Sequence, residues 1–114
     1  METATLGIVL QDGDVLLGKK KKGKIGIDKL CGPGGMLEPG ETLIQCLIRE
    51  TREELDIELD PAPLELAAVI DFYAAGKIDL RVYMYRTEMF RGNIRETEDM
   101  IPAWYPLNDL PYER

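Results

Sequence analysis

Three glutamates, Glu50, Glu53 and Glu54, stand close together in the first half of the chain. Side chains three and four positions apart lie near one face of a helix, so a helix would gather all three carboxylates. Like charges at this spacing destabilise an isolated helix by about 0.2–0.5 kcal/mol per pair. A divalent cation would offset that repulsion, since Mg²⁺ takes oxygen ligands, and the glycine turn at Gly35 could expose a carbonyl beside them. A solvated acidic helix face is the plain alternative.

The rest of the segment supports a helix that packs on a core. Apolar or β-branched side chains recur at helical spacing at Ile44, Ile48, Thr51 and Leu55. Thr42 is a suitable N-cap, and Gln45 three residues later completes a capping box. One face therefore packs, and the other presents carboxylates.

Length, composition and charge limit the classes of function. The chain has 114 residues, which we expect to form one domain, 1–114. Its 21 acidic residues exceed its 14 basic residues and give a net charge of −7, which disfavours a nucleic acid polymer as partner. A small phosphorylated substrate remains compatible, because a bound cation reverses the local sign of charge. We find no signal-peptide pattern and no apolar run of membrane-spanning length, so we expect no membrane partner.

The cysteine and histidine content restricts the chemistry further. Cys31 and Cys46 are the two cysteines, and there is no histidine. These residues provide neither a zinc-ligand spacing nor a disulfide framework, and we expect a cytoplasmic location. Without histidine, acid–base chemistry must use carboxylates, lysine, tyrosine or metal-bound water.

The elements around the helix are predicted to be strands. Alternating segments bounded by turn residues predict strands over residues 3–11, 15–19, 64–74, 80–87 and 102–107. Strands, one helix and further strands indicate an α+β fold, with a mixed sheet and the helix on one face. The basic loop at residues 19–24 is either a solvated charge run or an electrostatic collar for a polyphosphate.

The glycine turn and the acidic helix resemble the Nudix box, the signature of Nudix hydrolases. The matching positions are Gly35, Glu41, Arg49, Glu50, Glu53, Glu54 and Ile57. Two positions differ from the family pattern. Thr51 replaces an aliphatic residue, and its hydroxyl can bond back to a helix carbonyl. Asp56 replaces a glycine, and Asp tolerates φ > 0 better than most residues if the helix end requires it.

Segments outside the box resemble the oxidised-purine nucleoside triphosphatases, the MutT-like branch of the Nudix superfamily. The similarity lies in residues 15–20, in 98–100 and at Trp104. This resemblance implies a nucleotide substrate, with hydrolysis of 8-oxo-dGTP and related nucleotides to the monophosphate and pyrophosphate. It also implies Mg²⁺ as cofactor, with Mn²⁺ as a possible substitute.

The resemblance assigns roles to individual residues. The implied metal ligands are the Gly35 carbonyl and the carboxylates of Glu50, Glu53, Glu54 and Asp99, with Glu50 a further ligand or the general base. Arg49 would hold the rotamers of neighbouring carboxylates and so complete the catalytic set. The implied substrate-binding residues are Lys20, Cys31 and Glu98, and Glu98 could exchange roles with Asp99. Cys31 stands where the branch has a purine-reading asparagine, although a thiol is a poor donor and acceptor.

Two functional alternatives remain open at this stage. One is a Nudix hydrolase of another nucleoside diphosphate derivative, such as a dinucleoside polyphosphate or ADP-ribose. The other is a catalytically silent nucleotide-binding domain.

The family fold is an α/β/α sandwich whose second helix follows the last strand, and this sequence has no room for that helix. We therefore expect a domain shortened at its C-terminus, with the second sandwich helix missing. We also expect self-association as a homodimer through the uncovered sheet face, since exposed apolar patches promote association. Base-gripping residues of the branch would be missing too, which predicts poor discrimination between 8-oxo-dGTP and dGTP.

Overall fold

The computed structural model describes residues 1–21 and 30–108, so the predictions for Lys22 and Lys24 of the basic loop lie outside the described residues. The elements, in chain order, are β1 (Glu2–Gln11), β2 (Asp14–Lys20), β3 (Leu30–Cys31), β4 (Gly34–Met36), α1 (Leu43–Leu55), β5 (Glu58–Leu59), β6 (Glu65–Ala74), β7 (Lys77–Thr87), β8 (Phe90–Arg91) and β9 (Met100–Pro106).

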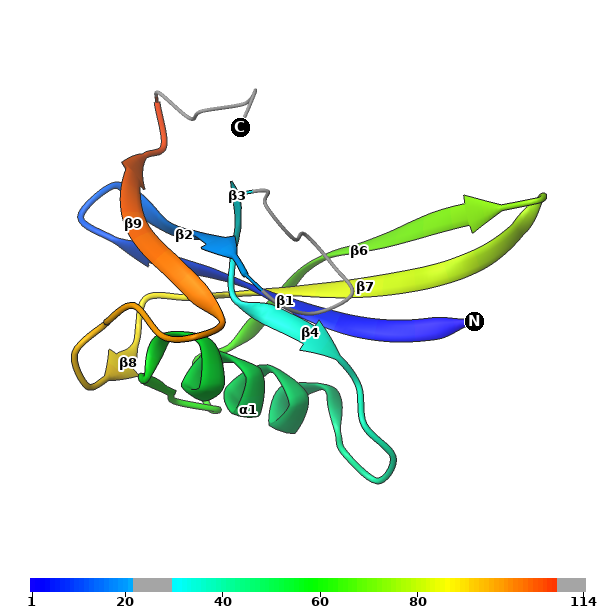
Figure 1. The fold of residues 1–114 in the computed structure, drawn as a ribbon, viewed down its shortest axis with the longest axis horizontal. Helices are drawn as coiled ribbons and strands as arrows, with labels where there is room; N and C mark the ends of the chain where they lie inside the picture. Colours follow the sequence, from blue (N-terminus) through cyan, green and yellow to red (C-terminus); the bar gives the residue numbers. More distant parts are fainter. Residues whose placement is uncertain (22–29, 109–114) are drawn as a thin grey trace.

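Seven strands form a mixed sheet with the order β3-β2-β1-β7-β6, in which β4 also pairs with β1 and β9 with β2. Strands β1 and β7 run parallel, and the other pairs in this sheet are antiparallel. Strands β5 and β8 make a separate two-stranded sheet. Helix α1 lies along one side of the main sheet (Figure 1), so the predicted α+β fold with the helix on one face is confirmed.

The long strands lie where the sequence predicts them, whereas the short strands were not predicted. Each predicted strand falls within a few residues of an observed one. Strands β3, β4, β5 and β8 have two or three residues each, which is too short for an alternating pattern to develop. In the described ranges, α1 is the one helix, and it lacks the length and apolar character needed to cross a membrane.

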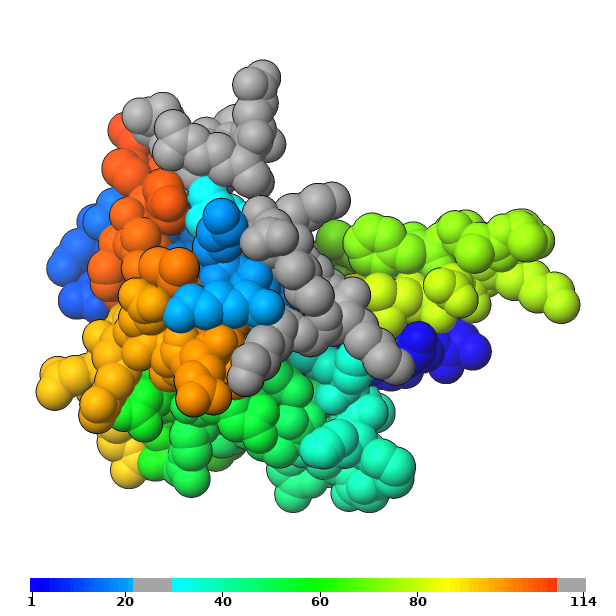
Figure 2. Space-filling model, viewed as in Figure 1, coloured from blue at the N-terminus to red at the C-terminus, as the bar shows by residue number. Residues whose placement is uncertain are grey.

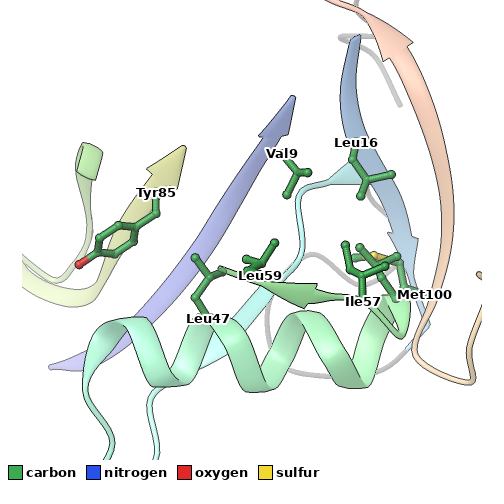
Figure 3. Packing of buried hydrophobic residues seen from close by; sticks show 8 residues of the cluster. Val9, Leu16, Leu47, Ile57, Leu59, Tyr85 and Met100 are labelled. Atoms are coloured by element: carbon green, nitrogen blue, oxygen red, sulfur yellow. The ribbon is translucent and has the colours of Figure 1, made fainter. Parts of the chain in front are cut away.

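The hydrophobic core lies between α1 and the sheet, as Figure 3 shows. Its buried members are Val9, Leu16, Leu47, Leu55, Ile57, Leu59, Tyr85 and Met100. The predicted apolar face of the helix is rotated slightly from expectation, since Ile44 and Ile48 are only partly buried while Cys46 and Glu54 face inward. This rotation brings the carboxylate of Glu54 into the protein interior, beside β4.

Both ends of α1 agree with the sequence prediction. The Gln45 N–H donates to Thr42 Oγ1 at 3.1 Å, and the Thr42 N–H donates to Gln45 Oε1 at 2.9 Å, which completes the capping box. At the other end Asp56 has φ 59°, the left-handed conformation that a glycine usually supplies. The possible back-bond from Thr51 is not formed, because its buried hydroxyl has no hydrogen-bond partner among the residues that the structure describes.

Candidate active site

Two successive glycines of β4 each meet one carboxylate of α1. The Gly34 N–H donates to Glu54 Oε1 at 2.8 Å. A Cβ on Gly35 would lie 2.5 Å from the carboxyl carbon of Glu50, so a larger residue would displace that side chain. The absence of a side chain at this position therefore lets Glu50 lie directly against the backbone of the turn.

Lys20 completes the contacts around Gly34 from β2. Its Nζ donates to the Gly34 carbonyl at 2.5 Å and lies 3.4 Å from Glu54 Oε2. The side chains of Lys20 and Glu54 are 3% and 5% exposed. The resemblance implies a substrate-binding role for Lys20, and in the structure its partners are the Gly34 carbonyl and Glu54.

The buried carboxylate of Glu54 and the partly buried carboxylate of Glu50 lie in surroundings that disfavour their charge. Burial raises the pKa of Glu54 to about 7, and the nearby Glu50 carboxylate adds to the rise. The Lys20 ammonium and the Gly34 N–H act in the opposite direction without cancelling it. Burial also raises the pKa of Glu50, although Arg49 opposes the shift. Both sites would hold a carboxylate more easily with additional positive charge nearby.

Arg49 links the helix carboxylates to the preceding turn. Its Nε and Nη2 donate to the two carboxyl oxygens of Glu41 at 2.6 and 3.0 Å, a bidentate pair. Its Nη1 donates to Glu50 Oε1 at 2.8 Å and lies 3.5 Å from Glu53 Oε2, while Nη2 donates to the Met36 carbonyl at 3.1 Å. These bonds raise the pKa of Arg49 above its usual value and lower that of Glu41. Arg49 therefore fixes where the Glu50 carboxylate sits.

Glu41 and Cys46 contribute to this region, and the sequence analysis gave neither of them a role. The position of Glu41 in the box, eight residues before Arg49, was a usable signal. For Cys46 there was none, because its contacts are tertiary. The Thr5 hydroxyl donates to Cys46 Sγ at 3.3 Å, and Sγ lies 3.6 Å from the Gly35 carbonyl. Burial raises the pKa of the Cys46 thiol, so it stays neutral behind the turn.

The loop that carries Glu98 and Asp99 is attached to α1 beside the buried carboxylate. Thr97 Oγ1 donates to the Glu54 carbonyl at 2.7 Å, and the Asp99 N–H donates to Thr97 Oγ1 at 3.1 Å. Asp99 is half-buried and Glu98 exposed. Asp99 also lies next to Met100, which pairs with Lys20 across β2 and β9.

Cys31 and Glu53 lie at the margins of this cluster. Cys31, on β3, is half-buried, and burial raises the pKa of its thiol. The charges of Lys20 and Glu54 also affect that pKa, which places Cys31 near both. Glu53 is 51% exposed on the open side of the helix and contacts Arg49. The structure thus gathers Gly35, Arg49, Glu50 and Glu54 tightly, with these two residues beside them.

The donors present here fit a hard divalent cation. Across residues 1–21 and 30–108, no three Asp, Glu, Cys or His side chains are grouped closely enough to hold a metal as they stand. The carboxylates of Glu50 and Glu54 are nevertheless oxygen donors whose burial calls for added positive charge. Glu53, the third glutamate of the helix, is half exposed and lies 3.5 Å from the Arg49 guanidinium. The chemistry of this donor set matches Mg²⁺ or Mn²⁺.

Comparison with known proteins agrees with this geometry. A model of the NUDIX domain matches residues 1–114. The oxidized purine nucleoside triphosphate hydrolase of Danio rerio is 35% identical over 111 residues, which cover 96% of this chain and 69% of that protein. The mouse (Mus musculus) protein of the same name is 35% identical over 109 residues, covering 95% of this chain and 68% of its own length.

Solved structures show the same fold. The MutT NUDIX hydrolase from Burkholderia pseudomallei superposes with a TM-score of 0.83 at 26% identity, covering 96% of this chain and 86% of that one. The E. coli ORF135 protein gives a TM-score of 0.73 at 27% identity, with coverages of 93% and 74%. The geometry of the box, the match to the NUDIX domain and these relatives lead to one conclusion. The chain belongs to the Nudix family of hydrolases, within its MutT-like branch.

Proposed function

We propose that this chain is a Mg²⁺-dependent pyrophosphohydrolase that acts on oxidised purine nucleoside triphosphates such as 8-oxo-dGTP. Its products would be the nucleoside monophosphate and pyrophosphate. The observation that carries the proposal is the contact of two carboxylates, the partly buried Glu50 and the buried Glu54, with the Gly34–Gly35 backbone. The names of the fish and mouse relatives support the substrate class.

The residues that would hold Mg²⁺ are the Gly35 carbonyl and the carboxylates of Glu50, Glu53 and Glu54, with Asp99 approaching from the neighbouring loop. When bound, the ion would neutralise charge on the non-bridging phosphate oxygens and make a bound water more acidic. Its charge would also offset the cost of keeping the buried Glu54 and the partly buried Glu50 ionised.

The protein's own groups position the reaction. Arg49 fixes Glu50 through a 2.8 Å bond, and Lys20 together with the Gly34 N–H fixes Glu54. Water would attack one phosphorus of the linkage between the α- and β-phosphates, and the bridging P–O bond would break. The phosphate group on the other side of that bond would leave with the bonding electron pair, which gives the monophosphate and pyrophosphate. A carboxylate of this set, with Glu50 as the first candidate, would take the proton released by the water.

One observation favours a different nucleotide as substrate. Cys31 stands at the position that reads the purine in the resembled branch, and a thiol is a weak donor and a weak acceptor. A Nudix enzyme for a dinucleoside polyphosphate or ADP-ribose would not need that base contact. These substrates therefore form the second candidate class.

A substrate panel separates the candidates. The chain would be incubated with 8-oxo-dGTP, dGTP, a dinucleoside polyphosphate and ADP-ribose in Mg²⁺, with pyrophosphate and phosphate release measured separately. Pyrophosphate release from 8-oxo-dGTP at the highest kcat/KM supports the proposal. A higher value for ADP-ribose or the dinucleoside polyphosphate would replace it with the second candidate. Tight nucleotide binding by calorimetry without turnover would show a silent binding domain.

A further inference from the structure

Strand β6 is a long, open edge of the main sheet. It ends the strand order, and among the described strands it pairs with β7 alone. The β6–β7 hairpin extends well beyond the helix and the rest of the domain (Figures 1 and 2). An edge strand presents unpaired N–H and C=O groups that can pair with another strand. The ten residues of β6 include neither Pro nor Lys, the residue types that commonly protect such edges.

Apolar side chains accompany this open backbone on both faces of β6. Leu66, Val69, Ile70, Phe72 and Tyr73 are 42–66% exposed. They account for five of the large exposed hydrophobic residues in the described part of the chain. This density exceeds the scattered exposed apolar residues that need no explanation, and it marks an interaction surface.

The charges of β6 are neutralised within its own hairpin. The carboxylate of Asp71 forms a bidentate pair with Arg81 on β7 at 2.7 and 3.1 Å. Glu65 lies 3.7 Å from Arg86, also on β7. An approaching strand therefore meets paired acids rather than a repulsive row of negative charge.

The regular part of β6 has a near-symmetric pattern of side chains. Register shifts against β7 occur between Leu66 and Ala68 and between Phe72 and Tyr73, which leaves a regular stretch from 68 to 72 centred on Ile70. In an antiparallel pair of two such stretches centred on Ile70, Phe72 faces Ala68 and Asp71 faces Val69. Each large Phe72 side chain then lies opposite a small Ala68, and the two Asp71 carboxylates do not face each other. Centring on Asp71 would instead place two like charges directly opposite, which destabilises a strand pair.

We propose that β6 pairs antiparallel with β6 of a second copy of this chain, around a two-fold axis at Ile70. A two-fold interface uses the same patch on both subunits, and a self-complementary edge strand provides such a patch. The pairing extends the main sheet across both copies and buries the exposed apolar residues of β6. It differs from association through an uncovered sheet face, because here the backbone edge makes the contact. The proposed active site lies on α1 and β4, so this inference does not depend on the proposed function.

Charge-pair rescue tests this arrangement. Ile70→Lys and Ile70→Glu would be measured separately and as an equimolar mixture by light scattering coupled to size exclusion, over a range of concentrations. We expect the measured mass of the wild type to rise with concentration toward that of two chains. Each variant should remain monomeric when alone, and the equimolar mixture should associate again. Far-UV circular dichroism checks that each variant is folded. Ile101→Lys is a matched control on β9, since Ile101 is 44% exposed and Ile70 is 42% exposed, and it should associate as the wild type does.

A second readout does not rely on substitutions. Hydrogen exchange of the wild type at low and high concentration should show protection that increases with concentration in residues 68–72. A wild type that remains monomeric at every concentration would overturn the proposal. So would association that both Ile70 variants retain, or a mixture that fails to associate although both variants are folded.

Discussion

Lys20 and Glu54 form an ion pair that is almost completely buried, with 3.4 Å between Nζ and Oε2. The same two side chains bind the backbone of Gly34 on both sides of its Cα, Lys20 at the carbonyl and Glu54 at the N–H. The pair therefore fixes the backbone just before Gly35, where the turn meets the helix carboxylates. In our account, Lys20 is a positioning residue for the site.

The first prediction concerns the stability of this pair. Lys20→Met leaves a buried carboxylate without its cation, which we expect to lower the free energy of unfolding by about 3–5 kcal/mol at pH 8. Adding Glu54→Gln should recover part of the loss, because no charge is then left unpaired. Urea unfolding of the wild type, both single variants and the double variant gives the coupling energy. Strictly additive losses would show that the two side chains do not stabilise each other.

The second prediction concerns pH. Burial moves the pKa of Glu54 from 4.5 to about 7, so the folded protein binds a proton there more tightly than the unfolded chain does. The metal-free protein should therefore lose stability as pH rises from about 4.5 to 7, and the contribution is complete below that window. Glu54→Gln should show a shallower decline over the same range. Thermal melts in excess chelator measure both slopes, and equal slopes would contradict the pKa shift.

The features that could be predicted from the sequence are those that depend on residues close together in the chain. Local signals were sufficient to predict where α1 begins and ends, because Thr42, Gln45 and Asp56 lie within one turn of the helix end that each of them caps. The burial of Glu54 was not predictable in this way. The glutamate that turns inward depends on Lys20 and Gly34, which come from two other strands. The same limit hid the contact of Cys46 with Thr5, which is 41 residues away.

The third prediction uses a buried group without a partner. The Thr51 hydroxyl is completely buried and has no hydrogen-bond partner within residues 1–21 and 30–108. Thr51→Val removes it and keeps the β-branched shape, so we expect the protein to gain about 1 kcal/mol of stability. Thr5→Val is the matched control, because that buried hydroxyl does have a partner, Cys46 Sγ, and should give no gain. A loss of stability in Thr51→Val would mean that its hydroxyl is satisfied after all.

The fourth prediction concerns base selectivity. Cys31→Asn introduces a strong donor and acceptor on β3, at a half-buried position near Lys20 and Glu54. We expect the ratio of kcat/KM for 8-oxo-dGTP over dGTP to rise by about tenfold, the effect of one discriminating hydrogen bond. Cys31→Ala should leave the ratio near that of the wild type. An unchanged ratio in the asparagine variant would show that position 31 does not read the base.

The central claim is that the box carboxylates hold a cation that performs phosphate chemistry. Its most direct test is pyrophosphate release from 8-oxo-dGTP at saturating Mg²⁺, by the wild type and by Glu53→Gln. Glu53 is half exposed, so this variant should fold and melt as the wild type does. We predict that its turnover falls by roughly 100-fold or more, as when a group that stabilises transition-state charge is removed, and that wild-type turnover stops in excess chelator. Near-normal turnover by Glu53→Gln, or full wild-type turnover in chelator, would contradict the account and leave these acids as a solvated helix face.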